Sequence, residues 1–183
     1  MGNDGKLLKS ALDVVRAFDM VADEALPKEI AGVVKLHSKL AVGSALIPVP
    51  GADVAAGAAA IWGMYLRINN KLDLKISENV VKTIASGVAT NLASYVAMLG
   101  IGSALKFIPG IGSIGGALAM GGALYGLTLT SGYVYLRALT AWKKEEGHTD
   151  LGKNVDDVLK NSKNEIKNFI SEAKSSYKNI KDN

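Results

Sequence analysis

The stretch "LKFIPGIGSIGGALAMGG", residues 105–122, decides how the centre of the chain folds. It holds one charged residue, one proline and six glycines. The earlier stretch "LIPVPGADVAAGAAA", residues 46–60, has the same Ile-Pro entry, Pro-Gly corner and run of small residues. Proline disfavours helix at the residue before it and glycine permits a sharp turn, so both stretches predict a corner followed by a helix. The expected structural corners are Pro48, Pro50, Gly51, Asp53, Pro109 and Gly110.

The glycines of the second stretch also fit the spacing of a phosphate-binding loop. Gly110, Gly112 and Gly115 form G-x-G-x-x-G, which binds dinucleotides where a strand precedes it and a helix follows. Here the preceding residues are typical of a helix, no acidic residue follows about twenty positions on, and the P-loop pattern is absent. The sequence therefore predicts no nucleotide site and no cofactor.

A second interpretation of these glycines is close helix packing. Each glycine inside a helix costs about 1 kcal/mol relative to alanine, but small residues four apart let two helices approach closely. Membrane helices tolerate glycine better than soluble ones, which favours a lipid environment without excluding a soluble bundle. The expected helix-packing residues are Gly112, Gly116, Gly122 and Gly126.

The distribution of charge divides the chain into three zones. Residues 40–136 hold only eight charged residues, and both ends are rich in charge. Apolar residues recur at helical spacing from Leu7 to Leu26, and Pro27 suits the first turn of a second helix. A nearly heptad apolar stripe follows from Val155 to Ile180, and no sustained alternation predicts a strand.

The predicted fold class is therefore all-α. We expect a helical bundle with a Gly/Ala-rich central hydrophobic hairpin and amphipathic N- and C-terminal helices. Residues 1–142 would form a single helical domain, and residues 143–183 a charged linker plus an amphipathic C-terminal helix.

The central segments are long enough to span a membrane. Residues 83–105 and 107–136 carry no charge, and about twenty apolar residues span a bilayer. Basic residues flank the pair, which predicts a transmembrane hairpin with both ends in the cytoplasm; the alternative is a soluble bundle in which the hairpin is buried. The tripeptide "YLR" occurs twice, at 65–67 and 135–137, near two tryptophans. The membrane-interface candidates are Trp62, Tyr65, Arg67, Tyr135, Arg137 and Trp142.

Composition excludes several classes of site. The chain has 183 residues, no cysteine, and two histidines that lie far apart, so no metal-binding cluster is expected. The net charge of +4 is spread along the chain rather than concentrated, which argues against nucleic-acid binding. His37 is interpreted as a surface or satisfied core histidine, and no catalytic constellation is visible. We therefore expect a non-enzymatic protein, with no catalytic, cofactor-binding or metal-binding residue.

The two corners resemble those of the bacterial DUF697 family, domains of unknown function of which some are linked to Era-like GTPases. The resemblance covers about residues 40–140 and rests on the corners at 47–53 and 108–112. It implies a membrane-associated helical domain that acts beside a GTPase, which would be a separate protein because this chain has no GTPase motif.

These observations together predict an accessory or scaffold protein at the bacterial inner membrane, on its cytoplasmic side, or a cytoplasmic protein if the hairpin stays buried. The expected partners are a lipid membrane, a separate GTPase and further copies of the chain. Two alternatives remain open: a pore-forming or membrane-perturbing protein with a colicin-like buried hairpin, and a soluble self-assembling helical module.

Overall fold

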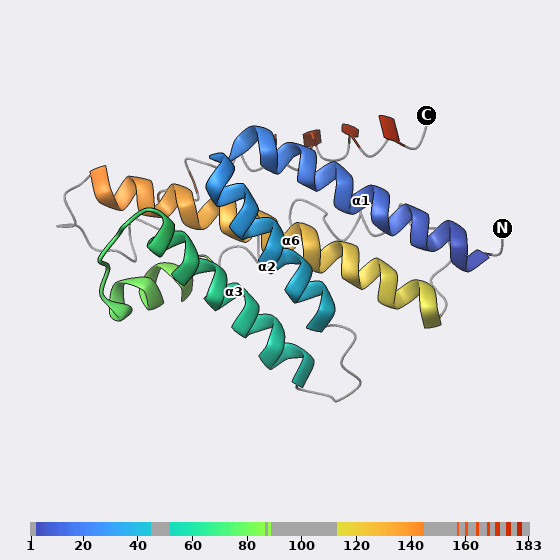
Figure 1. The fold of residues 1–183 in the computed structure, drawn as a ribbon, viewed down its shortest axis with the longest axis horizontal. Helices are drawn as coiled ribbons and strands as arrows, with labels where there is room; N and C mark the ends of the chain where they lie inside the picture. The colour runs from blue at the N-terminus through green and yellow to red at the C-terminus, as the bar shows by residue number, and fades with distance from the viewer. Residues whose placement is uncertain are drawn as a thin grey trace.

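The computed structural model describes residues 3–44, 52–86, 88 and 113–144, together with ten positions between 157 and 180. Over these ranges the chain is helical apart from short turns, and the described residues include no strand. Figure 1 labels the helices α1 (Asn3–Ala25), α2 (Lys28–Ser44), α3 (Ala52–Lys71) and α6 (Ser113–Lys144). The predicted all-α class is thus confirmed.

The first two helices meet at Pro27. The Leu26 N–H still donates to the Ala22 carbonyl at 3.0 Å, and this bond ends α1. The Pro27 carbonyl then accepts from the N–H groups of Ile30 and Ala31 at 2.8 and 2.9 Å, so Pro27 acts as the residue before the first turn of α2. The predicted position of the proline was therefore off by one residue.

The end of α3 is closed by a hydrogen-bonded cap. The Leu74 N–H donates to the Asn69 carbonyl at 3.0 Å, and the Asp73 N–H donates to the Asn70 carbonyl at 3.3 Å. This pair of bonds is the Schellman motif, whose residue after the cap adopts a left-handed conformation. Asp73 occupies that position with φ of 50°, where glycine is the usual residue.

A further helical segment covers residues 78–86, and Ser77 directly precedes its first residue. The Ser77 hydroxyl oxygen accepts from the Val80 N–H at a long 3.5 Å, and its carbonyl accepts from the Val81 N–H at 3.1 Å. Val81, Ile84, Ala85 and Val88 all join the main core, so this segment packs on the bundle.

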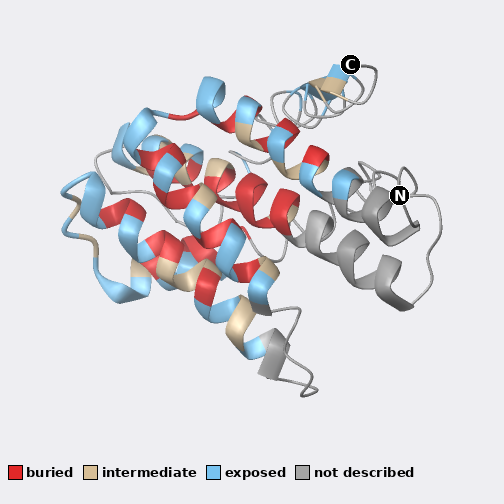
Figure 2. Cartoon of the chain, turned by 45° about the vertical axis from the view of Figure 1, so that its right-hand side comes forward, coloured by how far each residue is buried: buried red, intermediate tan, exposed pale blue. Residues whose placement is uncertain are grey.

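α2 and α6 form the centre of the bundle. The most extensive packing is between α2 and α3, and α6 packs mainly against α2 and α1. In Figure 1, α1, α3 and α6 run in broadly the same direction, and α2 returns across them. Buried residues concentrate where the helices face one another, as Figure 2 shows, so one apolar core joins all four helices.

The predicted central hairpin falls partly outside the described residues. Of its first segment, residues 83–86 and 88 are described, and of its second, the part from Ser113 onward. The long helix continues past the predicted end at Leu136 to Lys144. In the described part of the chain, no helix combines the length and the apolar character that a bilayer crossing requires.

Candidate functional site

The tyrosines of the two "YLR" tripeptides meet inside the bundle. The rings of Tyr65 on α3 and Tyr135 on α6 are stacked, with centroids 4.0 Å apart and an interplanar angle of 16°. The hydroxyl of Tyr65 hydrogen-bonds to that of Ser131, and the Tyr135 hydroxyl donates to the Asn69 side-chain oxygen at 3.1 Å. Each bond joins residues 66 apart in the chain, which means that α3 and α6 run in the same direction here.

Burial of this cluster perturbs both tyrosines. Desolvation raises the pKa of Tyr65 to about 12, and the nearby Tyr135 adds to the rise while the hydrogen bond to Ser131 opposes it. Burial likewise raises the pKa of Tyr135 to about 12, against the opposing effect of Asn69. Both phenols are therefore neutral at physiological pH and act as packing and hydrogen-bonding groups.

The membrane-interface expectation needs correction for these two rings. Tyr65 and Tyr135 are 2% and 0% exposed, so they lie in the core rather than on a surface that could reach lipid headgroups. A tyrosine two residues before an arginine also occurs where a helix passes from the core of a bundle to its surface. The stacked rings stabilise the packing of the two helices at this point.

The other interface candidates lie farther out. Arg67 and Arg137 are exposed, and Trp62 and Trp142 are half-buried. The indole N–H of Trp142 is buried without a hydrogen-bond partner in the described part of the chain. The assignment of these four residues to a membrane interface stays a prediction.

Most of the predicted corner residues lie outside the described ranges: Pro48, Pro50, Gly51, Pro109 and Gly110, as does Gly112. Asp53 is the second residue of α3, in its first turn. Gly116 and Gly122 lie within α6.

Two glycines of α6 sit in close contact with neighbouring helices. A Cβ on Gly126 would lie 2.7 Å from the Phe18 ring of α1, so this position accepts no side chain without movement of the ring. A Cβ on Gly132 would lie 2.7 Å from a methyl group of Val34 and 3.1 Å from the Met64 sulfur. The sequence singled out Gly126 but missed Gly132, because Gly132 has no glycine four residues away.

A second tyrosine contact joins α1 to α6. The Tyr125 hydroxyl donates to the Asp19 carboxylate, and Tyr125 is itself buried. Burial and the hydrogen bond to this carboxylate raise the pKa of Tyr125. Sequence reasoning missed this pair because the two residues lie 106 positions apart.

His37 is buried, and its Nδ1–H donates to the Val33 carbonyl at 2.9 Å. Its Nε2 lies 3.4 Å from the place of a Cβ on Gly63, so the glycine makes room for the imidazole ring. Within the described ranges, no three histidine or carboxylate side chains are grouped so that they could hold a metal ion.

The outward side of α2 carries apolar and basic residues together. Leu36 and Leu40 are 44% and 53% exposed, and a Cβ added at Gly32 or Gly43 would meet nothing within 4 Å. These positions and their exposed neighbours cover roughly 120° of the helix at 100° per residue. The α2 outer face consists of Lys28, Glu29, Gly32, Leu36, Lys39, Leu40 and Gly43.

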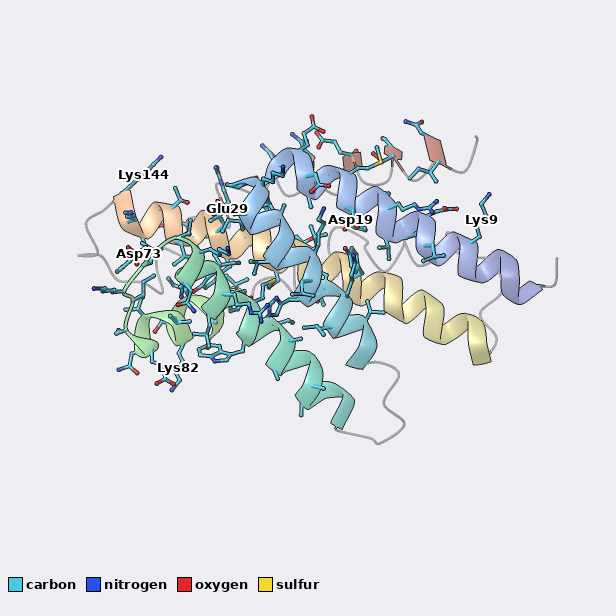
Figure 3. All side chains as sticks on the ribbon, in the orientation of Figure 1. Lys9, Asp19, Glu29, Asp73, Lys82 and Lys144 are labelled. Atoms are coloured by element: carbon cyan, nitrogen blue, oxygen red, sulfur yellow. The ribbon has the colours of Figure 1, made fainter. Side chains whose placement is uncertain are left out.

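A different feature lies at the end of the bundle where α3 and α6 finish. Figure 3 shows Lys144 and Asp73 at this end and Lys9 at the opposite end. A cavity of about 510 Å³ opens here between the turn after α3 and the last two turns of α6, with Pro27 of the α1–α2 turn in its wall. We call it the end groove. Its remaining lining residues are Leu72, Leu74, Leu136, Leu139, Thr140, Lys143 and Lys144.

Comparison of the chain with protein families, with curated proteins and with solved structures found no match.

Proposed function

We propose that this chain is a non-enzymatic, membrane-associated helical protein that serves as an accessory or scaffold at the bacterial inner membrane. The observation that carries the proposal is the α2 outer face, where Leu36 and Leu40 lie exposed beside Lys28 and Lys39.

The composition of this face suits the interface between water and lipid. A helix that lies on a membrane buries apolar side chains in the headgroup region, and flanking lysines contact anionic lipids. Leu36 and Leu40 are four residues apart, so they project side by side. The single acid of this face, Glu29, is in the first turn of α2, where its negative charge interacts favourably with the helix dipole. The net charge of +4 adds a general attraction to an anionic surface.

The test is flotation of the full chain with vesicles of neutral and anionic phospholipid. Burial of a leucine side chain is worth about 1.5–3 kcal/mol, so partial insertion of two predicts at least a tenfold loss of binding in Leu36→Ser/Leu40→Ser. The matched control is Leu12→Ser/Met20→Ser, which removes two exposed apolar side chains from α1. Lys28→Gln/Lys39→Gln should weaken binding to anionic vesicles only.

Three results would count against the proposal. Equal binding by both double-serine variants would show that the α2 outer face does not contact lipid. A change in mass in solution for Leu36→Ser/Leu40→Ser, without any vesicle binding by the parent chain, would indicate an interface between copies. Leakage of vesicle contents would point instead to the membrane-perturbing alternative. The separate GTPase partner rests on the family resemblance and stays a prediction.

A further inference from the structure

We propose that the end groove binds one medium-chain fatty acid anion, with its hydrocarbon chain along α6 toward Leu136 and its carboxylate against Lys143 and Lys144. This site lies apart from the α2 outer face and does not depend on it.

The α6 wall of the groove changes from apolar to cationic along the helix. Its lining positions 136, 139, 140, 143 and 144 are spaced by three and four residues, so they share one side of the helix. Two leucines come first, a threonine follows, and two exposed lysines end the row. The row extends roughly 12 Å along the helix axis, with an apolar end and a cationic end.

The facing wall offers hydrocarbon, and its backbone N–H groups are already hydrogen-bonded or absent. Pro27 has no N–H, and the N–H groups of Leu72 and Leu74 are bonded to the carbonyls of Ile68 and Asn69 at 3.0 Å. The Thr140 hydroxyl donates to the Leu136 carbonyl at 2.8 Å. A ligand inside the groove therefore meets side-chain hydrocarbon on both walls, which favours an alkyl chain over a polar molecule.

The charge of the lining residues indicates which group of the ligand lies at the lysine end of the groove. The described residues that line the groove include two lysines and no acid. Lysines in the last turn of α6 also suit the helix dipole, which explains their presence without a ligand. That explanation does not account for the apolar groove that leads up to them, whereas an alkyl carboxylate matches both features.

Volume distinguishes one chain from two. A cavity of about 510 Å³ is in the lower half of the range of about 300–1,000 Å³ that small-molecule sites occupy. We therefore assign it to a free fatty acid rather than to a two-chain phospholipid.

The test is calorimetric titration of the full chain with decanoate and laurate, each below its micelle concentration, and with dodecanol below its solubility limit. Laurate should bind saturably with one site per chain, and each methylene removed should weaken binding about fourfold. Thr140→Phe fills the groove from an exposed position and should abolish binding of both laurate and dodecanol. Circular dichroism of each variant verifies that the fold is retained.

The role of the lysines is measured by Lys143→Gln/Lys144→Gln. Exposed ion pairs are individually weak, so the double variant should lose about tenfold in laurate affinity and little in dodecanol affinity. The control, Lys9→Gln/Lys82→Gln, removes the same charge from lysines that do not line the groove.

The proposal is overturned by absence of saturable laurate binding, by binding that survives Thr140→Phe, or by an equal effect of the two double-lysine variants. Absence of laurate binding together with vesicle binding that Thr140→Phe removes would assign the groove to a membrane lipid instead. Vesicle binding through the α2 outer face is a separate measurement, so either proposal can fail alone.

Discussion

The ring of Tyr65 stacks on the ring of Tyr135, and each hydroxyl hydrogen-bonds to the helix that carries the other ring. The two tyrosines begin the same tripeptide in two helices that run in the same direction. The repeated tripeptide in the sequence therefore corresponds to a contact in the structure. Each of the two tripeptides supplies one tyrosine of a buried polar cluster.

The two hydroxyl groups should differ in their contribution to stability. Tyr65→Phe leaves Ser131, whose hydroxyl can turn to a backbone carbonyl four residues earlier, as Ser38 and Thr130 do at 2.9 and 2.7 Å. We expect a loss of about 0.5–1.5 kcal/mol in the free energy of unfolding. Tyr135→Phe leaves the buried Asn69 oxygen without its donor, and we expect a loss of about 1–3 kcal/mol.

Urea denaturation of the two variants measures this difference. The m-values should match that of the parent chain, so that a shift of the midpoint reports stability alone. A larger loss in Tyr65→Phe than in Tyr135→Phe would contradict the assignment of the hydrogen bonds.

Alkaline pH should destabilise the fold through the same pair. The pKa of each phenol rises from 10.0 to about 12 on folding. The unfolded chain therefore loses these protons at lower pH than the folded chain does. The stabilisation is fully present below pH 10 and is lost as pH rises from 10 to 12, by up to about 1.4 kcal/mol per pH unit for each tyrosine.

The measurement is the free energy of unfolding at intervals between pH 8 and 12. Tyr65→Phe removes one of the titrating groups, so its stability should fall less steeply above pH 10 than that of the parent chain. Parallel curves for the two proteins would refute a perturbed Tyr65.

Glycines of the bundle should respond to alanine in opposite directions. Gly132→Ala places a methyl group 2.7 Å from Val34, whose branched side chain has little freedom to move. Overpacking of this kind costs about 1–3 kcal/mol, which exceeds the helix-propensity gain of about 1 kcal/mol. Gly32→Ala has open space around it and should stabilise α2 by about 0.5–1 kcal/mol.

Thermal unfolding of Gly132→Ala and Gly32→Ala therefore gives a matched pair, since both substitutions add one methyl group inside a helix. The melting temperature should fall for the first and rise for the second. A rise for both would mean that the α2–α6 contact is looser than the distances indicate.

The helices and their order could be predicted from the sequence, because apolar spacing and proline positions act locally. The apolar spacing from Leu7 to Leu26 matches α1, which ends at Ala25, and α2 begins directly after Pro27. The direction in which Tyr65 and Tyr135 point could not be predicted. A tyrosine shortly before an arginine indicates that a helix passes from apolar to aqueous surroundings. The pattern is the same whether lipid or another helix provides the apolar surroundings.

The end groove could not be found from the sequence for a different reason. Its walls come from Pro27, from the turn at Leu72 and Leu74, and from α6, segments that are far apart in the chain. Each contributes ordinary apolar residues without a motif. The turn at Asp73, which gives the wall its shape, carried no glycine to mark it.

That turn provides a last prediction. Asp73 adopts φ of 50°, a conformation that costs roughly 1–2 kcal/mol for a residue with a Cβ and is free of this cost for glycine. Its N–H is already bonded to the Asn70 carbonyl, and glycine keeps that bond. Asp73→Gly should therefore raise the free energy of unfolding by about 0.5–1 kcal/mol, although the added freedom of the unfolded chain offsets part of the gain.

Asp73→Ala is the matched comparison, because it also removes the carboxylate but keeps a Cβ. Aspartate tolerates the left-handed conformation better than alanine does, so this variant should be less stable than the parent chain. Chemical denaturation should thus rank the chains as glycine, aspartate, alanine in decreasing stability. If alanine and glycine stabilise equally, the effect comes from loss of the charge, and the left-handed backbone at the end of α3 contributes nothing to it.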